Sequence, residues 1–100
     1  MISNVVVTYS VKAEALEEHL RLIAGVFDQL RADARDDVDY QVLRLADGVS
    51  FVHVSSADTA DGSNQLPQLA AFREFGADLA SRVTAPPIAS PADVVADYRR

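Results

Sequence analysis

The chain has no cysteine and no tryptophan, a single lysine (Lys12), and only four glycines and four prolines in its 100 residues. Without cysteine it forms neither disulfides nor thiolate metal sites, and nothing in this composition indicates a secreted disulfide scaffold. One hundred residues are enough for one domain with a core, so we expect residues 1–100 to fold as a single unit. A cytoplasmic location is the corresponding expectation.

Positive charge and long apolar runs are also scarce. Nine basic residues stand against fifteen acidic ones, and the net charge of -6 opposes binding to nucleic-acid phosphates and anionic membranes. The N-terminus lacks a basic stretch followed by an apolar one, and no apolar run approaches membrane-spanning length. The sequence therefore predicts a soluble, untargeted protein with no nucleic-acid partner and no membrane partner.

The stretch that organises the chain is a predicted hairpin over Tyr40–Ser55, in which Asp47 and Gly48 form the turn. Asp-Gly between apolar runs is typical of a type I′ turn, because both central residues of that turn need positive φ. If Ala46 and Val49 close a two-residue loop, the register is fixed along both strands. The predicted pairs are Leu45 with Ser50, Arg44 with Phe51, Leu43 with Val52, Val42 with His53, Gln41 with Val54 and Tyr40 with Ser55.

Alternation of side chains sorts this hairpin into two faces. The apolar face carries Leu43, Leu45, Val52 and Val54. The mixed face carries Tyr40, Val42, Arg44, Phe51, His53 and Ser55. We expect helices to cover the apolar face, because the mixed face is too polar for an ordinary core and too aromatic for plain solvated surface.

The other elements complete an α+β domain. Asn4–Val11 is rich in β-branched residues and predicts the first strand, and apolar spacing predicts helices from Ala13 to about Ala34 and from Leu66 to Thr84. Three prolines exclude a helix between Ala85 and Pro91, so Asp93–Tyr98 is the predicted last strand. The order strand, helix, strand, strand, helix, strand is the ferredoxin-like βαββαβ arrangement. It predicts a four-stranded antiparallel sheet with two helices on one face.

Particular side chains are assigned from the same periodicities. We expect Val6, Thr8 and Ser10 to share the face of His53. His19 lies at the edge of the apolar stripe of its helix and is expected at the surface, and Arg82 lies outside the stripe of the second helix. The expected helical core positions are Leu16, Leu20, Ile23, Phe27 and Leu30, then Leu66, Leu69, Phe72, Phe75, Leu79 and Val83. Gly25 inside the first helix costs about 1 kcal/mol relative to Ala, which suggests a close packing contact or a slight bend.

The mixed face has a consequence for assembly. Large exposed patches rimmed by polar groups usually mark interaction sites. A two-fold homodimer that lays one sheet against the other uses the same patch twice, and is therefore the simplest way to cover it.

Three stretches carry a resemblance to a known group of proteins. They are Val-Val-Val-Thr-Tyr-Ser-Val-Lys before an acidic helix, the strand Phe51–Ser55, and the following helix with Leu69, Phe72 and Phe75. With the element order, they resemble the dimeric α+β barrel superfamily, and within it the antibiotic biosynthesis monooxygenase-like and related uncharacterised domains. The resemblance covers about Asn4 to Tyr98.

This resemblance implies a homodimer whose sheets form a barrel, with a ligand cavity between sheet and helices or inside the barrel. It also implies activities, since the superfamily includes cofactor-independent oxygenases of electron-rich polyphenols and haem-degrading oxygenases. The monooxygenases commonly place Asn, Trp and His or Arg around the substrate. Here Trp is absent, Asn4 lies at the start of its strand and is not assigned, and the only helical histidine available to a haem is His19.

The candidate site comes from the hairpin register. His53 has Tyr40 and Arg44 as diagonal neighbours, so its imidazole is placed to accept a proton from a phenolic substrate while Arg44 stabilises the phenolate. The catalytic candidates are therefore His53 and Arg44, and the substrate-binding candidates are Tyr40, Phe51, Ser55 and Thr8. The alternative is that His53 and Arg44 are polar members of a dimer interface.

We expect no metal and no cofactor. Asp58, Asp61 and Asn64 offer oxygen ligands, but their loop lacks the spacing and terminal Glu of a calcium loop. Two functions follow. The first is a cofactor-independent, monooxygenase-like enzyme acting on an aromatic or quinone-type small molecule. The second is a non-catalytic dimeric domain that binds a small ligand or builds an assembly.

Overall fold

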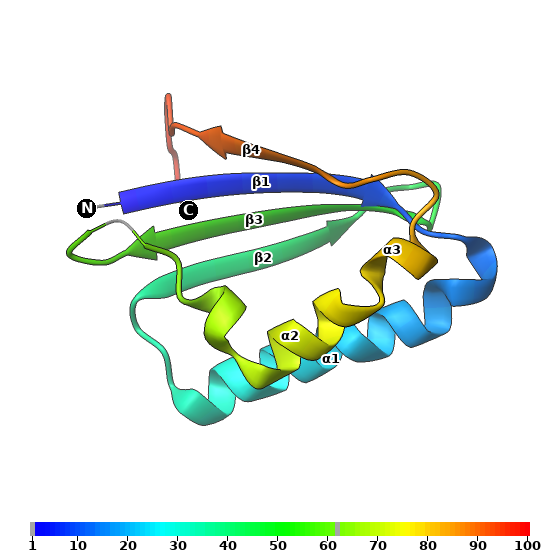
Figure 1. Ribbon diagram of the computed structural model, residues 1–100. Helices are drawn as coiled ribbons and strands as arrows, with labels where there is room; N and C mark the ends of the chain where they lie inside the picture. Colours follow the sequence, from blue (N-terminus) through cyan, green and yellow to red (C-terminus); the bar gives the residue numbers. More distant parts are fainter. Residues whose placement is uncertain (1, 62) are drawn as a thin grey trace.

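The computed structural model describes residues 2–61 and 63–100, which form one four-stranded antiparallel sheet with helices on one side (Figure 1). The strands are β1 (Ile2–Ser10), β2 (Val38–Arg44), β3 (Ser50–Asp58) and β4 (Ile88–Ala92), in the spatial order β2-β3-β1-β4. The helices are α1 (Leu16–Asp33), α2 (Ala70–Ala77) and α3 (Leu79–Arg82), with 3₁₀ turns η1 (Ala13–Ala15) and η2 (Leu66–Gln68). The predicted ferredoxin-like fold is confirmed. No helix within the described residues is long and apolar enough to cross a membrane.

The predicted hairpin register is confirmed from Tyr40 paired with Ser55 to Arg44 paired with Phe51. The turn itself differs from the predicted type I′. Only Gly48 has a positive φ, of 81°, and its amide donates to the carbonyl of Leu45 over 3.0 Å. The turn therefore spans Leu45 to Gly48, and Asp47 contributes through its side chain by accepting from the amides of Val49 and Ser50.

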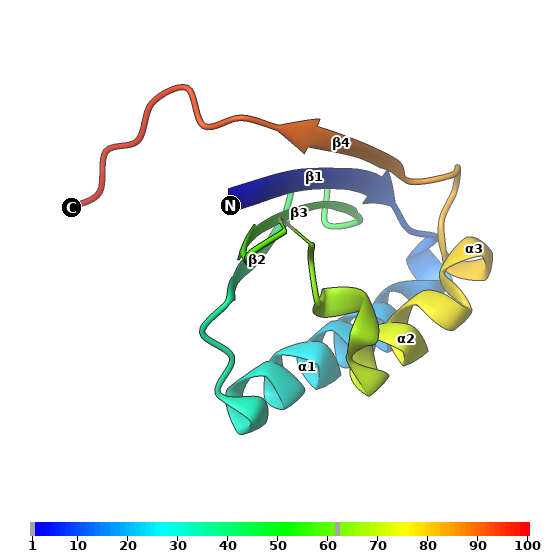
Figure 2. The ribbon, with the colours of Figure 1, turned by 60° about the vertical axis from the view of Figure 1, so that its left-hand side comes forward.

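The prediction of which hairpin face the helices cover is wrong. The helices pack on the mixed face, where Phe51 and His53 are 2% and 6% exposed, whereas Leu43 and Leu45 are 43% and 48% exposed on the open face. The physical reason is that His53 of the mixed face bonds to Tyr40 and to Tyr9 of β1, and among the described residues no buried side-chain nitrogen or oxygen lacks a hydrogen-bond partner. Figure 2 shows the open face turned away from the helices.

The face assignment of the first strand is reversed for the same reason. Val7 pairs with His53 and Tyr9 pairs with Phe51, so these β1 residues share the covered face. Thr8 pairs with Val52 and is exposed on the opposite face, away from His53.

The first helix is confirmed, but its buried stripe is rotated from the prediction. Its buried residues are His19, Leu22 and Val26, whereas Leu20 is 38% exposed. The expectation that His19 lies at the surface is wrong, because its ring is enclosed by Tyr9, Phe51 and Phe75. Gly25 has no close packing contact, since a Cβ there would meet nothing within 4 Å.

The second helix is shorter than predicted and is broken into η2, α2 and α3. Leu69 is extended, with ψ of 135°, and the helix breaks again at Asp78, two residues after the weak helix former Gly76. Arg82 was expected outside the apolar stripe but is only 5% exposed. These breaks turn α3 so that the Arg82 side chain enters the core.

The last strand lies earlier than predicted. Ile88–Ala92 pairs with β1, although it contains Pro91, and Asp93–Tyr98 forms no strand. Pro is tolerated here because β4 is an edge strand. The segment after β4 extends away from the body of the domain, with Val95 and Tyr98 98% and 95% exposed (Figure 2).

Candidate functional site

A pocket of about 320 Å³ opens between the covered face of the sheet and the helices. Its apolar wall is formed by Val5, Val7, Leu66, Pro67, Phe72, Phe75, Gly76 and Leu79. Its polar groups are Tyr9, Tyr40, His53, Ser55 and Asn64. Ligand pockets in proteins are typically apolar with a few convergent polar groups and volumes of roughly 300–1,000 Å³, so this pocket lies at the small end of that class.

The polar groups of the sheet form a continuous hydrogen-bonded chain behind the pocket. Oη of Tyr9 lies 2.7 Å from Nε2 of His19 and 2.5 Å from Nε2 of His53. Nδ1 of His53 lies in turn 2.5 Å from Oη of Tyr40. The hydroxyl of Tyr9 therefore links a histidine of α1 to a histidine of β3, and Tyr40 ends the chain at the pocket.

The other end of the chain is the guanidinium of Arg82. Its Nε donates to Nδ1 of His19 over 3.1 Å, and one terminal nitrogen donates to the carbonyl of Phe75 over 2.5 Å. The guanidinium carbon also lies 5.3 Å from the centre of the Phe75 ring. Among the described residues Arg82 has no carboxylate within ion-pair distance. The imidazole of His19 and the carbonyl and ring of Phe75 therefore take the place of water around its guanidinium.

Burial determines the protonation states of the histidines and tyrosines in this hydrogen-bonded chain. It lowers the pKa of His19 to about 4, with a further contribution from the charge of Arg82, and lowers the pKa of His53 to about 4, aided by His19. Burial also raises the pKa of the Tyr9 and Tyr40 hydroxyls well above the ordinary value for tyrosine. Near neutral pH both imidazoles are neutral and both phenols keep their protons.

Aromatic packing holds the chain in place. The Tyr40 ring stacks on Phe27 of α1, with centroids 5.1 Å apart and an interplanar angle of 2°. The Tyr9 ring stacks on Phe51 at 5.8 Å. These contacts fix both phenol rings and leave their hydroxyl groups directed at His53.

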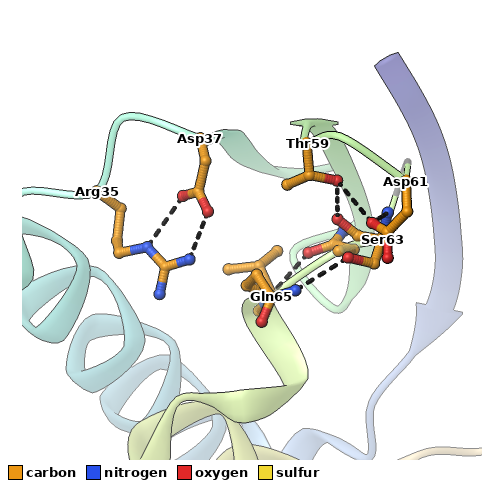
Figure 3. A network of polar contacts seen from close by, with 8 residues as sticks. Arg35, Asp37, Thr59, Asp61, Ser63 and Gln65 are labelled. Carbon is orange, nitrogen blue, oxygen red and sulfur yellow. Dashed lines mark hydrogen bonds and ion pairs between the residues drawn. The ribbon is translucent and has the colours of Figure 1, made fainter. Parts of the chain in front are cut away.

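The remaining polar wall comes from the connection between β3 and η2. Asn64 donates from Nδ2 to Oγ of Ser55 over 3.2 Å and accepts the amide of Leu66 at Oδ1. Figure 3 shows how this connection is tied down: Thr59 donates to the carbonyl of Ser63, and Gln65 donates to Oγ of Ser63. Leu66 and Pro67 are thereby held against the pocket.

The neighbouring connection between α1 and β2 is fixed by an ion pair. Arg35 donates from two nitrogens to the carboxylate of Asp37, over 2.9 and 2.6 Å (Figure 3). The Arg35 guanidinium holds the pKa of the Asp37 carboxyl below its usual range. This pair precedes the first residue of β2 and so supports the strand that carries Tyr40.

The structure brings together three of the six residues named from the sequence. His53, Tyr40 and Ser55 meet at the pocket. Phe51 packs in the core against Tyr9 and His19, and Thr8 lies on the opposite face. Arg44 is exposed at the end of β2 and, within the described residues, makes no hydrogen bond with His53.

Sequence reasoning missed Tyr9, His19, Arg82 and Asn64 as site residues. A signal for His19 existed, because it lies three and seven residues before the apolar Leu22 and Val26, on one face of the helix. Arg82 likewise follows Phe75 by seven residues. Within residues 2–61 and 63–100, no group of three or more His, Cys, Asp or Glu side chains is placed to hold a metal ion.

The sheet order and the helices on one face are those of a ferredoxin-like fold, and solved structures described as antibiotic biosynthesis monooxygenases share this fold. Rv0793 from Mycobacterium tuberculosis matches 99% of this chain and 100% of its own, with a TM-score of 0.80 and 14% identity. SnoaB from Streptomyces nogalater, a cofactor-independent oxygenase, matches 99% of this chain and 98% of its own, with a TM-score of 0.72 and 14% identity.

A further structure described as an antibiotic biosynthesis monooxygenase has a TM-score of 0.77 at 14% identity, over 96% of this chain and 100% of its own. No protein-family model matches the sequence, and no curated protein matches it. At these identities the similarity establishes the fold.

Proposed function

We propose that this protein is a cofactor-independent, monooxygenase-like enzyme that takes a small aromatic, phenolic or quinone-type molecule into the pocket between sheet and helices. The observation that carries the proposal is the hydrogen-bonded chain of Tyr9, His53 and Tyr40, which ends in a hydroxyl at a largely apolar pocket. A flat apolar ligand with one or two oxygen atoms matches that lining. The fold shared with a cofactor-independent oxygenase supports the same assignment.

In this proposal Tyr40 contacts the oxygen of the substrate, and His53 holds Tyr40 in position from behind. Ser55 and Asn64 offer a second polar contact on the neighbouring wall. The reaction converts an activated ring CH₂ group and O₂ into a carbonyl group and water. One oxygen atom enters the substrate, and the other leaves as water with the two hydrogens.

The test is oxygen uptake by purified protein with 1,8-dihydroxyanthrone, together with mass spectrometry of the quinone product. Tyr40→Phe removes only the hydroxyl, and we expect it to lower the rate above the uncatalysed background by about tenfold or more. Tyr98→Phe is the matched control, because Tyr98 is 95% exposed outside the pocket. Equal rates for Tyr40→Phe and wild type would contradict a role of the hydrogen-bonded chain in the reaction.

A second candidate function is binding of the same kind of molecule without turnover. It is favoured by the low pKa of His53, about 4, because a neutral imidazole bonded to two tyrosines is a poor proton acceptor near pH 7. Tight binding of the quinone product with no oxygen uptake from the anthrone would establish this second function.

We also propose that a second copy of the chain covers the open face of the sheet, which is apolar at Leu43, Leu45, Val52, Val54 and Ile88. Large exposed apolar patches usually mark interaction sites, and a two-fold dimer covers the patch with itself. Native mass spectrometry at low micromolar concentration tests this. A monomer under these conditions would contradict the dimer.

A further inference from the structure

The hydrogen bonds behind the pocket favour one arrangement of protons. Arg82 is a pure donor, because a guanidinium has N–H groups and no acceptor. Since Nε of Arg82 donates to Nδ1 of His19, that nitrogen has to be the acceptor, and the neutral ring carries its proton on Nε2. His19 therefore donates from Nε2 to Oη of Tyr9.

The next link follows from the burial of Tyr9. Its hydroxyl accepts from His19, and its own proton needs an acceptor, for which Nε2 of His53 lies 2.5 Å away. If His53 carried its proton on Nε2 instead, the Tyr9 hydroxyl proton would have no acceptor among the described residues, at a residue only 8% exposed. An unpaired buried donor costs about 1–3 kcal/mol, so that tautomer is disfavoured.

The same reasoning fixes the last link. With Nε2 of His53 as acceptor, its Nδ1 carries the proton and donates to Oη of Tyr40. The hydroxyl proton of Tyr40 then has no acceptor among the described residues, and this residue lines the pocket. All four bonds run in one direction, from the cation to the pocket.

We propose that Arg82 is a positioning residue that sets this direction, so that Tyr40 is always a hydrogen-bond donor to the ligand. The pocket therefore selects a ligand with an acceptor oxygen, either a phenolate or a quinone-type carbonyl, over a neutral phenol. Aligned hydrogen bonds polarise one another, and the positive end of each bond dipole points toward the pocket, which strengthens the Tyr40 hydroxyl as a donor. A bond to an ionised oxygen is stronger than a bond to a neutral one, so the phenolate gains more than the phenol. The inference rests on the proposed ligand pocket and specifies its ligand.

The hydrogen-bonded chain also opposes proton transfer in the reverse direction, from the ligand toward Arg82. A proton passed from the ligand as far as His19 would make that imidazole a cation, with its Nδ1 only 3.1 Å from Nε of Arg82. Two cations in contact within a buried site are strongly disfavoured. Arg82 therefore opposes transfer of the ligand's proton to His19 and favours the hydrogen-bonded chain as a donor to the ligand.

The direction is measurable without any ligand. The chain contains only two histidines, so ¹⁵N NMR of the imidazole rings at pH 7 assigns each tautomer directly. We expect His19 to be protonated on Nε2 and His53 on Nδ1. The opposite tautomer at His53 would overturn the direction, whether or not the protein has oxygenase activity.

The selection is measurable with 4-nitrophenol, whose phenolate absorbs visible light. We expect the wild-type protein to bind the phenolate about tenfold or more tightly than the phenol, so that the apparent pKa of the bound probe falls by about one unit or more. Tyr40→Phe should abolish this preference, and Tyr98→Phe should retain it. Preference for the neutral phenol, or no binding of either form, would overturn the acceptor assignment.

Two Arg82 variants separate direction from packing. Arg82→Lys keeps a donor that cannot accept, so it should retain both the His53 tautomer and most of the preference for the phenolate. Arg82→Met keeps a similar length but frees Nδ1 of His19 to carry the proton, so it should lose the preference. Equal behaviour of the folded Lys and Met variants would show that Arg82 acts only through packing and would overturn the positioning role.

Discussion

Arg82 donates to Nδ1 of His19 over 3.1 Å, although 63 positions separate the two residues in the chain. This bond joins the short α3 to the middle of the core and explains why a cation with no ion-pair partner among the described residues is only 5% exposed. Burial lowers the pKa of Arg82, but its guanidinium stays charged. The bond connects the fold to the pocket, because every proton position between His19 and Tyr40 depends on it.

The first prediction is a loss of stability in mild acid. In the folded state the pKa of both His19 and His53 is lowered from 6.5 to about 4, so between these values the unfolded chain binds more protons. Stability is therefore fully present above about pH 6.5 and is lost as the pH falls toward 4. We expect a loss on the order of 2 kcal/mol per histidine between pH 7 and pH 5.

Urea unfolding at pH 7, 6 and 5 measures this. The carboxyl groups with lowered pKa, such as Asp37 and Asp47, affect stability only below their ordinary pKa of 3.8, so they do not contribute in this range. A urea midpoint that stays constant from pH 7 to pH 5 is incompatible with two buried neutral histidines.

The second prediction concerns the covered face of the sheet. Phe51 is 2% exposed and contacts the rings of Tyr9 and His19, so Phe51→Ala should lower the free energy of unfolding by about 3–5 kcal/mol. Val95→Ala, at a residue 98% exposed, should change it by less than about 0.5 kcal/mol. If Phe51→Ala were as mild as Val95→Ala, the helices would not cover this face.

The sequence predicted the hairpin register but not the covered face, and the reason is physical. Alternation sorts side chains into two sets, and register follows from the turn, but neither says which set meets the helices. Tyr40 and His53 were assigned to the open side because isolated polar groups are costly to bury. Partners from β1, α1 and α3 remove that cost, and those partners are distant in the sequence.

The same limitation affected the candidate site. His53 and Tyr40 were found because they are cross-strand diagonal neighbours on one hairpin, and the structure confirms their contact. Arg44 is equally close by register, but it lies at the strand end, where its long side chain remains in solvent. Tyr9, His19 and Arg82 reach His53 only through the tertiary fold. Local sequence patterns do not show contacts between residues this far apart in the sequence, so this connection could not be predicted.

The third prediction compares two glycines under the same substitution. A Cβ at Gly25 meets nothing within 4 Å in the middle of α1, so Gly25→Ala should raise the free energy of unfolding by about 0.5–1 kcal/mol. Gly48 also has free space around it, but its φ of 81° is unfavourable for alanine, so Gly48→Ala should lower the free energy of unfolding by about 1 kcal/mol. Thermal unfolding of both variants checks the signs, and effects of the same sign would contradict one of the two backbone conformations.

The last prediction concerns Tyr9, at the centre of the hydrogen-bonded chain. Tyr9→Phe removes one oxygen atom and leaves Nε2 of His19 and Nε2 of His53 without their partner in the core. Each unpaired buried group costs about 1–3 kcal/mol, so we expect a loss of about 2–4 kcal/mol in the free energy of unfolding. Tyr40→Phe leaves a single nitrogen unpaired, at the pocket, where water can reach it, and should cost only about 1 kcal/mol. Urea unfolding at pH 7 of both variants, with Tyr98→Phe as the matched control, measures the difference. A Tyr9→Phe variant no less stable than Tyr40→Phe would show that the two histidines find other partners, and the directed chain behind the pocket would not exist in solution.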